Sequence, residues 1–231
     1  MSSPPAPIDV SAFVSIVDHT LLKATATYDD VVRLCDEAIE LGTAAVCVNS
    51  MWVDLVRRRL DTSDVATCSV VGFPLGAMAS TALATEATVA VADGAHEIDM
   101  VIPVGPLQAG DDAVVAAHVT AVREASPSCI VKVILETALL TTEQIARACS
   151  IAEAHGADFV KTSTGFDPAG GATVEAVTLM AASVASTTGV KASGGIRTLA
   201  DVEAMIAAGA TRLGMSATRA VVDEIRTTTR A

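Results

Sequence analysis

Three of the four lysines in this chain lie inside short apolar runs that are typical of β-strands. Lys132 lies in the run IVKVIL, Lys161 in DFVKT and Lys191 in GVKAS. A lysine in apolar surroundings loses hydration of its ammonium group, which lowers its pKa and makes the nucleophilic amine available. Two or three such amines in one pocket would lower one another's pKa further. These residues predict an enzyme that forms an imine with a carbonyl substrate.

The alternative is that a chain with eleven arginines simply uses few lysines, and that these three extend from edge strands into water. Only Lys23 has the setting of an ordinary solvated lysine, so its replacement should be nearly silent. The three strand lysines are followed by Ser, Thr or Gly turns, or by a carboxylate, which favours the catalytic interpretation.

Two carboxylates lie in a fourth apolar run, EIDMV at 97–101. Because side chains alternate along a strand, Glu97 and Asp99 share one face, while Ile98 and Met100 point to the other. A carboxylate inside a barrel is costly unless it is paired or takes part in chemistry. Asp99 is therefore predicted either to transfer protons beside an amine or to form an ion pair with a lysine.

Hydroxyl and glycine residues follow two of the lysines. The sequence TSTG follows Lys161, and its hydroxyls either orient a carbonyl group or bond to the backbone of their own turn. ASGGIR follows Lys191, and GMS at 214–216 precedes a helical pattern. Glycine turns and helix N-termini present backbone N–H groups to anions, so these two segments, with Arg197, predict a phosphate site.

The composition excludes several classes of protein. A net charge of −12 without a long basic run argues against a nucleic-acid partner. Five cysteines without a C-x-x-C pair are typical of reduced thiols in the cytoplasm, and the four histidines lack metal-ligand spacing. No apolar run reaches the ~18 residues that span a bilayer, and the N-terminus does not resemble a signal peptide. We expect a soluble cytoplasmic protein that binds neither metal nor membrane.

The spacing of apolar runs and helix signals predicts the fold. Helix signals run from Thr27 to Gly42, from Thr141 to Gly156 and from Thr198 to Gly209. Strands are predicted at 15–18, 44–48, 66–71, 97–102, 130–135, 159–161, 190–192 and 212–214. Eight alternating units favour an α/β chain folded as a single-domain (β/α)8 TIM barrel over a Rossmann sheet, and no G-x-G-x-x-G follows an early strand. The domain is predicted to cover 1–231, with 1–8 as a flexible extension.

In such a barrel, functional groups occupy the C-terminal ends of the strands. Several polar residues lie late in a predicted strand or directly after one, which predicts that they meet at one rim. These residues are Asp18, Asn49, Asp99, Glu136, Lys161, Lys191 and Ser216.

These segments resemble the deoxyribose-phosphate aldolase family. The resemblance rests on DHTLLK (18–23), VVGFPLG (70–76), EIDMV (97–101), VKVILET (131–137), FVKTSTG (159–165) and KASGGIR (191–197). It implies a class I aldolase, without metal or cofactor, on a (β/α)8 barrel. The implied reaction is reversible cleavage of 2-deoxy-D-ribose 5-phosphate to acetaldehyde and D-glyceraldehyde 3-phosphate.

The resemblance also implies roles for single residues. Lys161 falls on the Schiff-base lysine, and Lys191 and Asp99 fall on the proton relay. Implied substrate contacts are Asp18, Thr20, Cys47, Lys132 and Thr164, and implied phosphate contacts are Gly165, Gly194, Gly195, Gly214 and Ser216. The chain departs from some relatives at Phe166 and Ala217, where those carry lysine and serine, and in having Tyr28 as its only tyrosine.

Two other functions remain open from the sequence. The first is a lysine aldolase on the same barrel that acts on a larger keto-sugar phosphate. The second is a sugar-phosphate-binding barrel whose lysines only neutralise the anion. The alanine-rich helices also leave self-association, as a homodimer, open.

Overall fold

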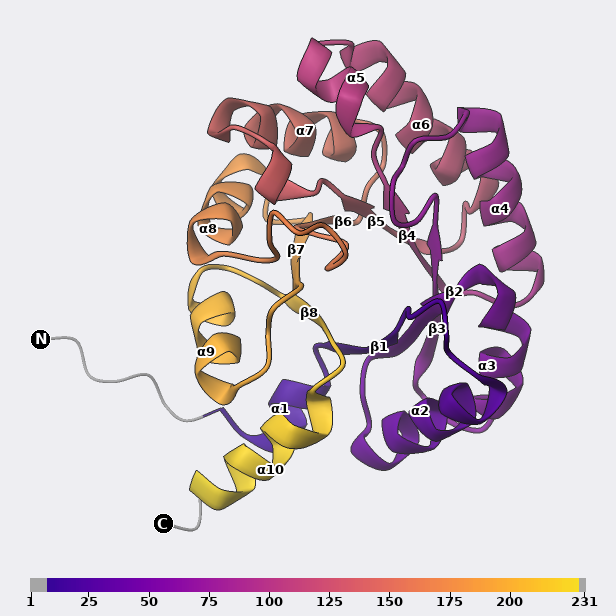
Figure 1. Cartoon of the computed structure of the whole chain (residues 1–231), viewed down its shortest axis with the longest axis vertical. Helices are drawn as coiled ribbons and strands as arrows, with labels where there is room; N and C mark the ends of the chain where they lie inside the picture. Colours follow the sequence, from indigo (N-terminus) through magenta and orange to yellow (C-terminus); the bar gives the residue numbers. More distant parts are fainter. Residues whose placement is uncertain (1–7, 229–231) are drawn as a thin grey trace, which may run out of the picture.

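The computed structural model describes residues 8–228, and eight parallel strands form a closed barrel in the order β1 to β8. Helices surround the barrel on all sides (Figure 1). The strands are β1 (Val17–Leu21), β2 (Ala45–Asn49), β3 (Ala66–Val71), β4 (Glu97–Val101), β5 (Ile130–Ile134), β6 (Phe159–Lys161), β7 (Gly189–Ser193) and β8 (Arg212–Met215). The predicted (β/α)8 TIM barrel is confirmed.

The helices follow the strands along the chain, and two short 3-10 turns, η1 and η2, interrupt the connections. The helical elements are α1 (Val10–Val14), α2 (Tyr28–Leu41), η1 (Ser50–Trp52), α3 (Val53–Arg59), α4 (Ser80–Ala92), α5 (Val104–Ala109), α6 (Asp112–Ala125), η2 (Thr137–Leu139), α7 (Thr142–Ala154), α8 (Val174–Ser183), α9 (Leu199–Ala207) and α10 (Thr218–Thr228). The first and last of these, α1 and α10, pack against each other (Figure 1).

Capping residues set the helix boundaries much as the sequence predicts. Thr27 and Thr141 each form a capping box, with Asp30 and Gln144 respectively. The helix after Thr27 stops at Gly42, which has a left-handed conformation with φ 72°. The helices α7 and α9 each end two residues before the predicted glycine, at Ala154 and Ala207.

The predicted strands match the observed ones, with the largest difference in β1. The prediction placed this strand at 15–18, whereas it runs from Val17 to Leu21. Ser15 and Ile16 instead form the turn after α1, where their N–H groups bond to the carbonyl oxygens of Ser11 and Phe13. The strand therefore continues through His19 and Thr20, which carries their side chains to the C-terminal end of the barrel.

Alternation along the strands separates two kinds of packing. On β2, Val46 and Val48 point outward against α2 and α3, while Ala45 and Cys47 point into the barrel. Cys68 lies beside Cys47 on the inner face of β3. The barrel interior is therefore apolar along β2 and β3, and the charged residues come from the other strands.

Three further expectations from the sequence concern the cysteines, membrane-spanning helices and the N-terminal extension. All five cysteines are buried free thiols, as expected. Within residues 8–228 no helix has the length and apolar character needed to cross a membrane. Residues 1–7 of the predicted extension lie outside the described residues, and Ile8 packs against the main hydrophobic core.

Candidate active site

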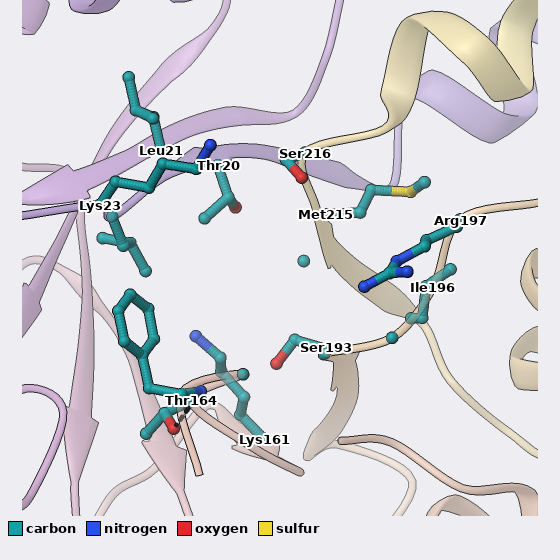
Figure 2. Close-up of a pocket in the computed structure, with 16 residues that line it drawn as sticks. Thr20, Leu21, Lys23, Lys161, Thr164, Ser193, Ile196, Arg197, Met215 and Ser216 are labelled. Carbon is teal, nitrogen blue, oxygen red and sulfur yellow. Dashed lines mark hydrogen bonds between the residues drawn. The ribbon is translucent and has the colours of Figure 1, made fainter. Parts of the chain in front are cut away.

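A cavity of about 370 Å³ opens at the C-terminal end of the barrel. Its walls come from β1, β8 and the segments that follow β6 and β7 (Figure 2). The polar and glycine residues that line it are Thr20, Lys23, Lys161, Thr164, Gly165, Ser193, Gly194, Gly195, Arg197, Gly214 and Ser216. In Figure 2 the amine of Lys161 and the guanidinium of Arg197 both point into the open space.

A cluster of seven charged side chains fills the barrel beneath the cavity. It contains three carboxylates and four cations: Asp18, Glu97, Asp99, Lys132, Lys161, Lys191 and Arg212. Six of these are at most 4% exposed, and Arg212 is 12% exposed. Because each is removed from water, its neighbours decide its charge.

Lys132 has the most carboxylate partners. Its Nζ lies 2.6 Å from Glu97 Oε2, 2.7 Å from Asp99 Oδ1 and 3.2 Å from Asp18 Oδ2. Burial alone would lower the pKa of Lys132, but the negative charges around it outweigh burial and hold that pKa well above its usual value. Lys132 is therefore a firmly charged ammonium.

Lys191 is also held as a cation. Its Nζ contacts Asp18 and lies 2.7 Å from Asp99 Oδ2. Burial opposes the charge, yet Asp18 and Asp99 raise the pKa of Lys191 above its usual value. The expected net lowering of pKa is therefore wrong for Lys132 and Lys191. The charge of Lys132 does lower the pKa of Lys191, but the carboxylates outweigh it.

Lys161 differs from the other two lysines in both contacts and access. Its one carboxylate partner is Asp99, whose Oδ2 lies 2.7 Å from Nζ and also accepts from Lys191. Of the three barrel lysines, only Lys161 lines the cavity. It ends β6, so its side chain reaches the open end of the barrel.

The two aspartates of the cluster, Asp18 and Asp99, are ionised. Burial would raise the pKa of Asp18, but Lys132, Lys191 and Arg212 lower it to about 2. The pKa of Asp99 is likewise held well below its usual value, against burial, by the three lysines. Asp99 thus forms the predicted ion pair, with all three lysines, and this pairing does not decide whether Asp99 also transfers protons. The prediction that Glu97 and Asp99 share the inner face is also confirmed, since both contact Lys132.

The glycines at this end of the barrel allow close approach. A Cβ on Gly214 would lie 2.9 Å from Ser193 Cβ and 3.0 Å from Lys191 Cε. Gly214 thus makes room for the side chain of Lys191, and it lies within β8 rather than after the strand. A Cβ on Gly194 would lie 3.3 Å from Gly165 Cα, so the segment that follows β7 is in contact with the segment that follows β6.

The three hydroxyls after Lys161 have different partners. Thr162 donates to the Ser193 carbonyl oxygen at 3.1 Å and accepts from Ser193 N–H at 3.0 Å, which joins β6 to β7. Ser163 is fully buried, and its hydroxyl has no hydrogen-bond partner. Only Thr164 lines the cavity. The expectation that these hydroxyls orient a carbonyl group is therefore wrong for Thr162 and Ser163.

Most of the residues predicted from the sequence to form the site fall into two groups, one that lines the cavity and one that lies in the charged cluster below it. Those that line the cavity are Thr20, Lys161, Thr164, Gly165, Gly194, Gly195, Gly214 and Ser216. Asp18, Asp99, Lys132 and Lys191 lie in the charged cluster below. Cys47 is fully buried beside Cys68 in the same interior. Asn49 lies at the rim but donates to the Leu22 carbonyl oxygen at 3.2 Å, which is a structural contact.

Five further residues belong to the site: the sequence predicts only a position for Glu97, Lys23 and Glu136, and predicts nothing for Arg212 and Ser193. Glu97 and Arg212 complete the charged cluster, because Arg212 donates to Glu97 at 3.0 Å and to Asp18 at 3.1 Å. Lys23 is exposed, as expected, yet it lies at the cavity mouth with Ser193. The carboxylate of Glu136 accepts the N–H and O–H of Thr164. Burial raises the pKa of Glu136, although the Thr164 hydrogen bonds oppose this shift.

Two groups of buried side chains in the described residues have the spacing of metal ligands. They are Cys47, Cys68 and Asp99, and Asp18, Cys68 and Glu97, with ligand atoms within 4.8 Å of one another. Their carboxylates already form ion pairs with Lys132, and Lys132 also donates to Cys68 at 3.3 Å. The ammonium groups and a metal cation would compete for the same space.

The chain is similar to known aldolases over nearly its whole length. The model of the DeoC/LacD aldolase family matches residues 13–224. A deoxyribose-phosphate aldolase from Bacillus cereus is 50% identical over 208 residues, which are 90% of this chain and 93% of that protein.

Solved structures agree. A structure from Coccidioides immitis has a TM-score of 0.93 at 42% identity and covers 96% of this chain and 88% of its own. The deoxyribose phosphate aldolase from Aeropyrum pernix, described as having a unique tetrameric structure, has a TM-score of 0.86 at 31% identity. That match covers 93% of this chain and 91% of the other.

Proposed function

The chain belongs to the DeoC/LacD aldolase family, and we propose that it catalyses the reversible cleavage of 2-deoxy-D-ribose 5-phosphate. The products are acetaldehyde and D-glyceraldehyde 3-phosphate. The Bacillus cereus relative supports this substrate at 50% identity. The proposed reaction is that of a metal-independent class I aldolase with Lys161 as the nucleophile.

One observation carries the proposal: a single barrel lysine combines access to the cavity with weak charge compensation. Lys161 lines the cavity and has Asp99 as its one carboxylate partner. Lys132 has three such partners, and Lys191 has two. Lys161 is therefore the one barrel lysine that combines access to a substrate with a single carboxylate partner.

The charge of the whole cluster supports the same choice. With every member ionised, four cations and three carboxylates leave one positive charge in excess inside the barrel. An uncompensated buried charge is unfavourable, and loss of one proton removes it. The proposed reaction uses Lys161, the lysine that faces the cavity, as the neutral amine that attacks a carbonyl carbon.

The neutral amine of Lys161 attacks C1 of the open-chain sugar, and the resulting carbinolamine loses water to form an iminium. Acetaldehyde contains C1 and C2, so the bond that breaks is C2–C3. The electron pair of this bond moves toward the iminium nitrogen as the C3 hydroxyl loses its proton, which leaves an enamine and releases the three-carbon aldehyde phosphate. Protonation of the enamine at C2 and hydrolysis of the imine then release acetaldehyde and regenerate Lys161.

Asp99 and Lys191 are proposed to move the protons. Asp99 Oδ2 accepts hydrogen bonds from Lys161 and Lys191, each at 2.7 Å, and so links the two amines directly. The Asp99 carboxylate stabilises the positive charge that forms on the iminium nitrogen. Neither Asp99 nor Lys191 lines the cavity, so a water molecule completes the path to the substrate.

The phosphate is proposed to bind at the wall of the cavity opposite Lys23 in Figure 2. Ser216 and Arg197 lie on this side, and Arg197 extends a guanidinium into the cavity, which Gly165, Gly194 and Gly195 also line. Backbone N–H groups and a cation are the groups that bind phosphate. Binding there holds the reacting carbons in position above Lys161.

We further propose that the enzyme works in the cytoplasm as a homodimer. Its five buried free thiols suit a reducing compartment. Exposed apolar side chains such as Met51 and Leu75 support self-association. Sedimentation equilibrium of the purified chain tests the dimer, and a mass of one chain would contradict it.

Product analysis tests the reaction. We expect 2-deoxy-D-ribose 5-phosphate to yield acetaldehyde and D-glyceraldehyde 3-phosphate in equal amounts, without added metal and with EDTA present. A larger keto-sugar phosphate that is cleaved without acetaldehyde would show that the chain is a different lysine aldolase. Binding of the sugar phosphate without cleavage would support a binding barrel instead.

A further inference from the structure

Glu136 has an unusual backbone and an unusual environment for a glutamate. It follows β5 with φ 57° and ψ 61°, and it is the only non-glycine among residues 8–228 with a positive φ. Its side chain is 4% exposed. A left-handed conformation costs energy for a residue with a Cβ, and a buried carboxylate must be satisfied by donors. The surroundings must therefore hold Glu136 firmly.

Among the described residues, Thr164 is the one donor of hydrogen bonds to the Glu136 carboxylate. The Thr164 N–H donates to Oε1 and Oε2 at 3.2 and 3.3 Å, and the Thr164 hydroxyl donates to Oε2. Because that hydroxyl donates to Glu136, its oxygen remains free to accept from Phe166 N–H at 3.1 Å. The carboxylate thereby fixes Thr164, and the Thr164 hydroxyl in turn holds the N–H of Phe166 at the other end of the segment 164–166.

This segment forms one wall of the cavity. Thr164, Gly165 and Phe166 all line the cavity, and Gly165 abuts Gly194 of the segment that follows β7. Phe166 makes an edge-to-face contact with Phe73, with ring centroids 5.2 Å apart. A shift of Thr164 would therefore displace Gly165 from Gly194, where the segments that follow β6 and β7 are in contact.

We propose that Glu136 is a positioning residue that holds the 164–166 segment in the shape that binds the substrate phosphate. This inference rests on the proposed function. Glu136 acts through Thr164 and Gly165 and does not itself touch the reacting carbons. Its removal should therefore weaken binding of the phosphorylated substrate more than it weakens imine formation at Lys161.

Glu136→Gly is the sharpest variant, because glycine accepts the left-handed conformation while it removes the carboxylate. We expect KM for 2-deoxy-D-ribose 5-phosphate to rise about tenfold or more, as loss of hydrogen bonds to a charged group implies. The kcat/KM for unphosphorylated 2-deoxy-D-ribose should change much less. Glu136→Gln, which keeps one acceptor oxygen, should be intermediate, and the exposed Glu143→Gln should match the unaltered enzyme.

Two outcomes would overturn the inference. In the first, the preference for the phosphorylated over the unphosphorylated sugar stays within about twofold of the unaltered enzyme in both Glu136 variants. In the second, both substrates lose activity equally, which would indicate a general structural role. If Glu136→Gly does not fold, Thr164→Val removes the same hydroxyl link and should change the preference in the same direction.

Borohydride trapping of acetaldehyde separates these outcomes from failure of the proposed function. Trapping on Lys161 in the unaltered enzyme and in Glu136→Gly, with an unchanged substrate preference, would contradict only the role of Glu136. Absence of trapping in the unaltered enzyme would contradict the aldolase assignment and this inference together.

Discussion

Lys132 and Lys161 lie in two neighbouring regions of the barrel interior that differ in access and in charge balance. Around Lys132, in the closed part, Asp18, Glu97 and Asp99 surround a single ammonium group. Around Lys161, at the open end, one oxygen of Asp99 is shared with a second lysine. Both lysines lie on strands among apolar residues, so their sequence settings are alike.

The difference shows that burial alone does not make a lysine nucleophilic. Lys132 is 0% exposed and is held charged, because its carboxylate partners outweigh the cost of burial. Lys161 is nearly as buried, at 3%, but has less compensation and faces the cavity. The charged neighbours thus decide which lysine can act as a nucleophile and which supports the structure.

Lys161→Met should have the largest effect on activity and a small effect on stability. Loss of the nucleophile should lower kcat/KM by on the order of 10⁴-fold or more. Because Asp99 keeps Lys132 and Lys191 as partners, the unfolding free energy should be nearly unchanged. Steady-state kinetics and urea unfolding test both expectations, and substantial remaining turnover would contradict the role of Lys161.

Lys132→Met should show the opposite pattern in stability. Its removal takes one cation partner from each of Asp18, Glu97 and Asp99, and loss of one partner of a buried ion pair costs about 3–5 kcal/mol. Urea unfolding of this variant beside Lys161→Met measures the contrast. Equal unfolding free energies for the two variants would contradict the proposed difference between the surroundings of Lys132 and those of Lys161.

Gly214→Ala should lower activity through a displacement of Lys191. The added Cβ would press on Lys191 Cε, at 3.0 Å, and displace the amine that shares Asp99 with Lys161. A displacement of about 1 Å can lower a rate about 10²-fold, so kcat should fall by roughly 10- to 100-fold. Borohydride trapping on Lys161 should persist. A variant with unaltered kcat would show that the position of Lys191 is not critical.

Acid should weaken the closed region first. The pKa of Asp18 is about 2 in the folded protein, below the ordinary value of 3.8. Its ion pairs therefore stabilise the fold fully above about pH 4, and this stabilisation is lost as the pH falls toward 2. Unfolding free energies measured between pH 5 and pH 2 should show this loss. In Lys132→Met the unfolding free energy should fall less between pH 5 and pH 2, because Asp18 has one cation partner fewer.

Lys23→Ala should have the smallest effect. Lys23 is exposed at the cavity mouth, where water screens its charge. A solvated charge contributes about 0.2–1 kcal/mol, so kcat/KM should change by less than about fivefold. Kinetics of this variant beside Lys161→Met would sharpen the comparison. A large loss would mean that Lys23 takes part in substrate binding.

The sequence predicts the fold well, because each barrel strand is a short β-branched run bounded by helix caps and glycines. Seven of the eight strands agree with the predicted ranges to within one residue at each end, and two of these, β3 and β6, agree fully. The convergence of Asp99, Lys161 and Lys191 also follows from their positions near strand ends.

The pairing of charges inside the barrel could not be predicted from the sequence. Which carboxylate meets which lysine depends on the stagger of eight strands around a closed sheet, and it places Lys132 against Asp18 although 114 positions separate them. The roles of Glu97, Arg212 and Glu136 depend on these contacts, so they became visible only in the structure. Thr162 and Ser163 could not be distinguished from Thr164, because a hydroxyl's partner depends on its orientation.

The most direct test of the central claim is borohydride reduction in the presence of acetaldehyde, followed by peptide mass spectrometry. We predict a two-carbon adduct on Lys161 and none on Lys132 or Lys191, because only Lys161 combines access with weak charge compensation. An adduct on Lys132 or Lys191, or no adduct on folded protein, would contradict this account.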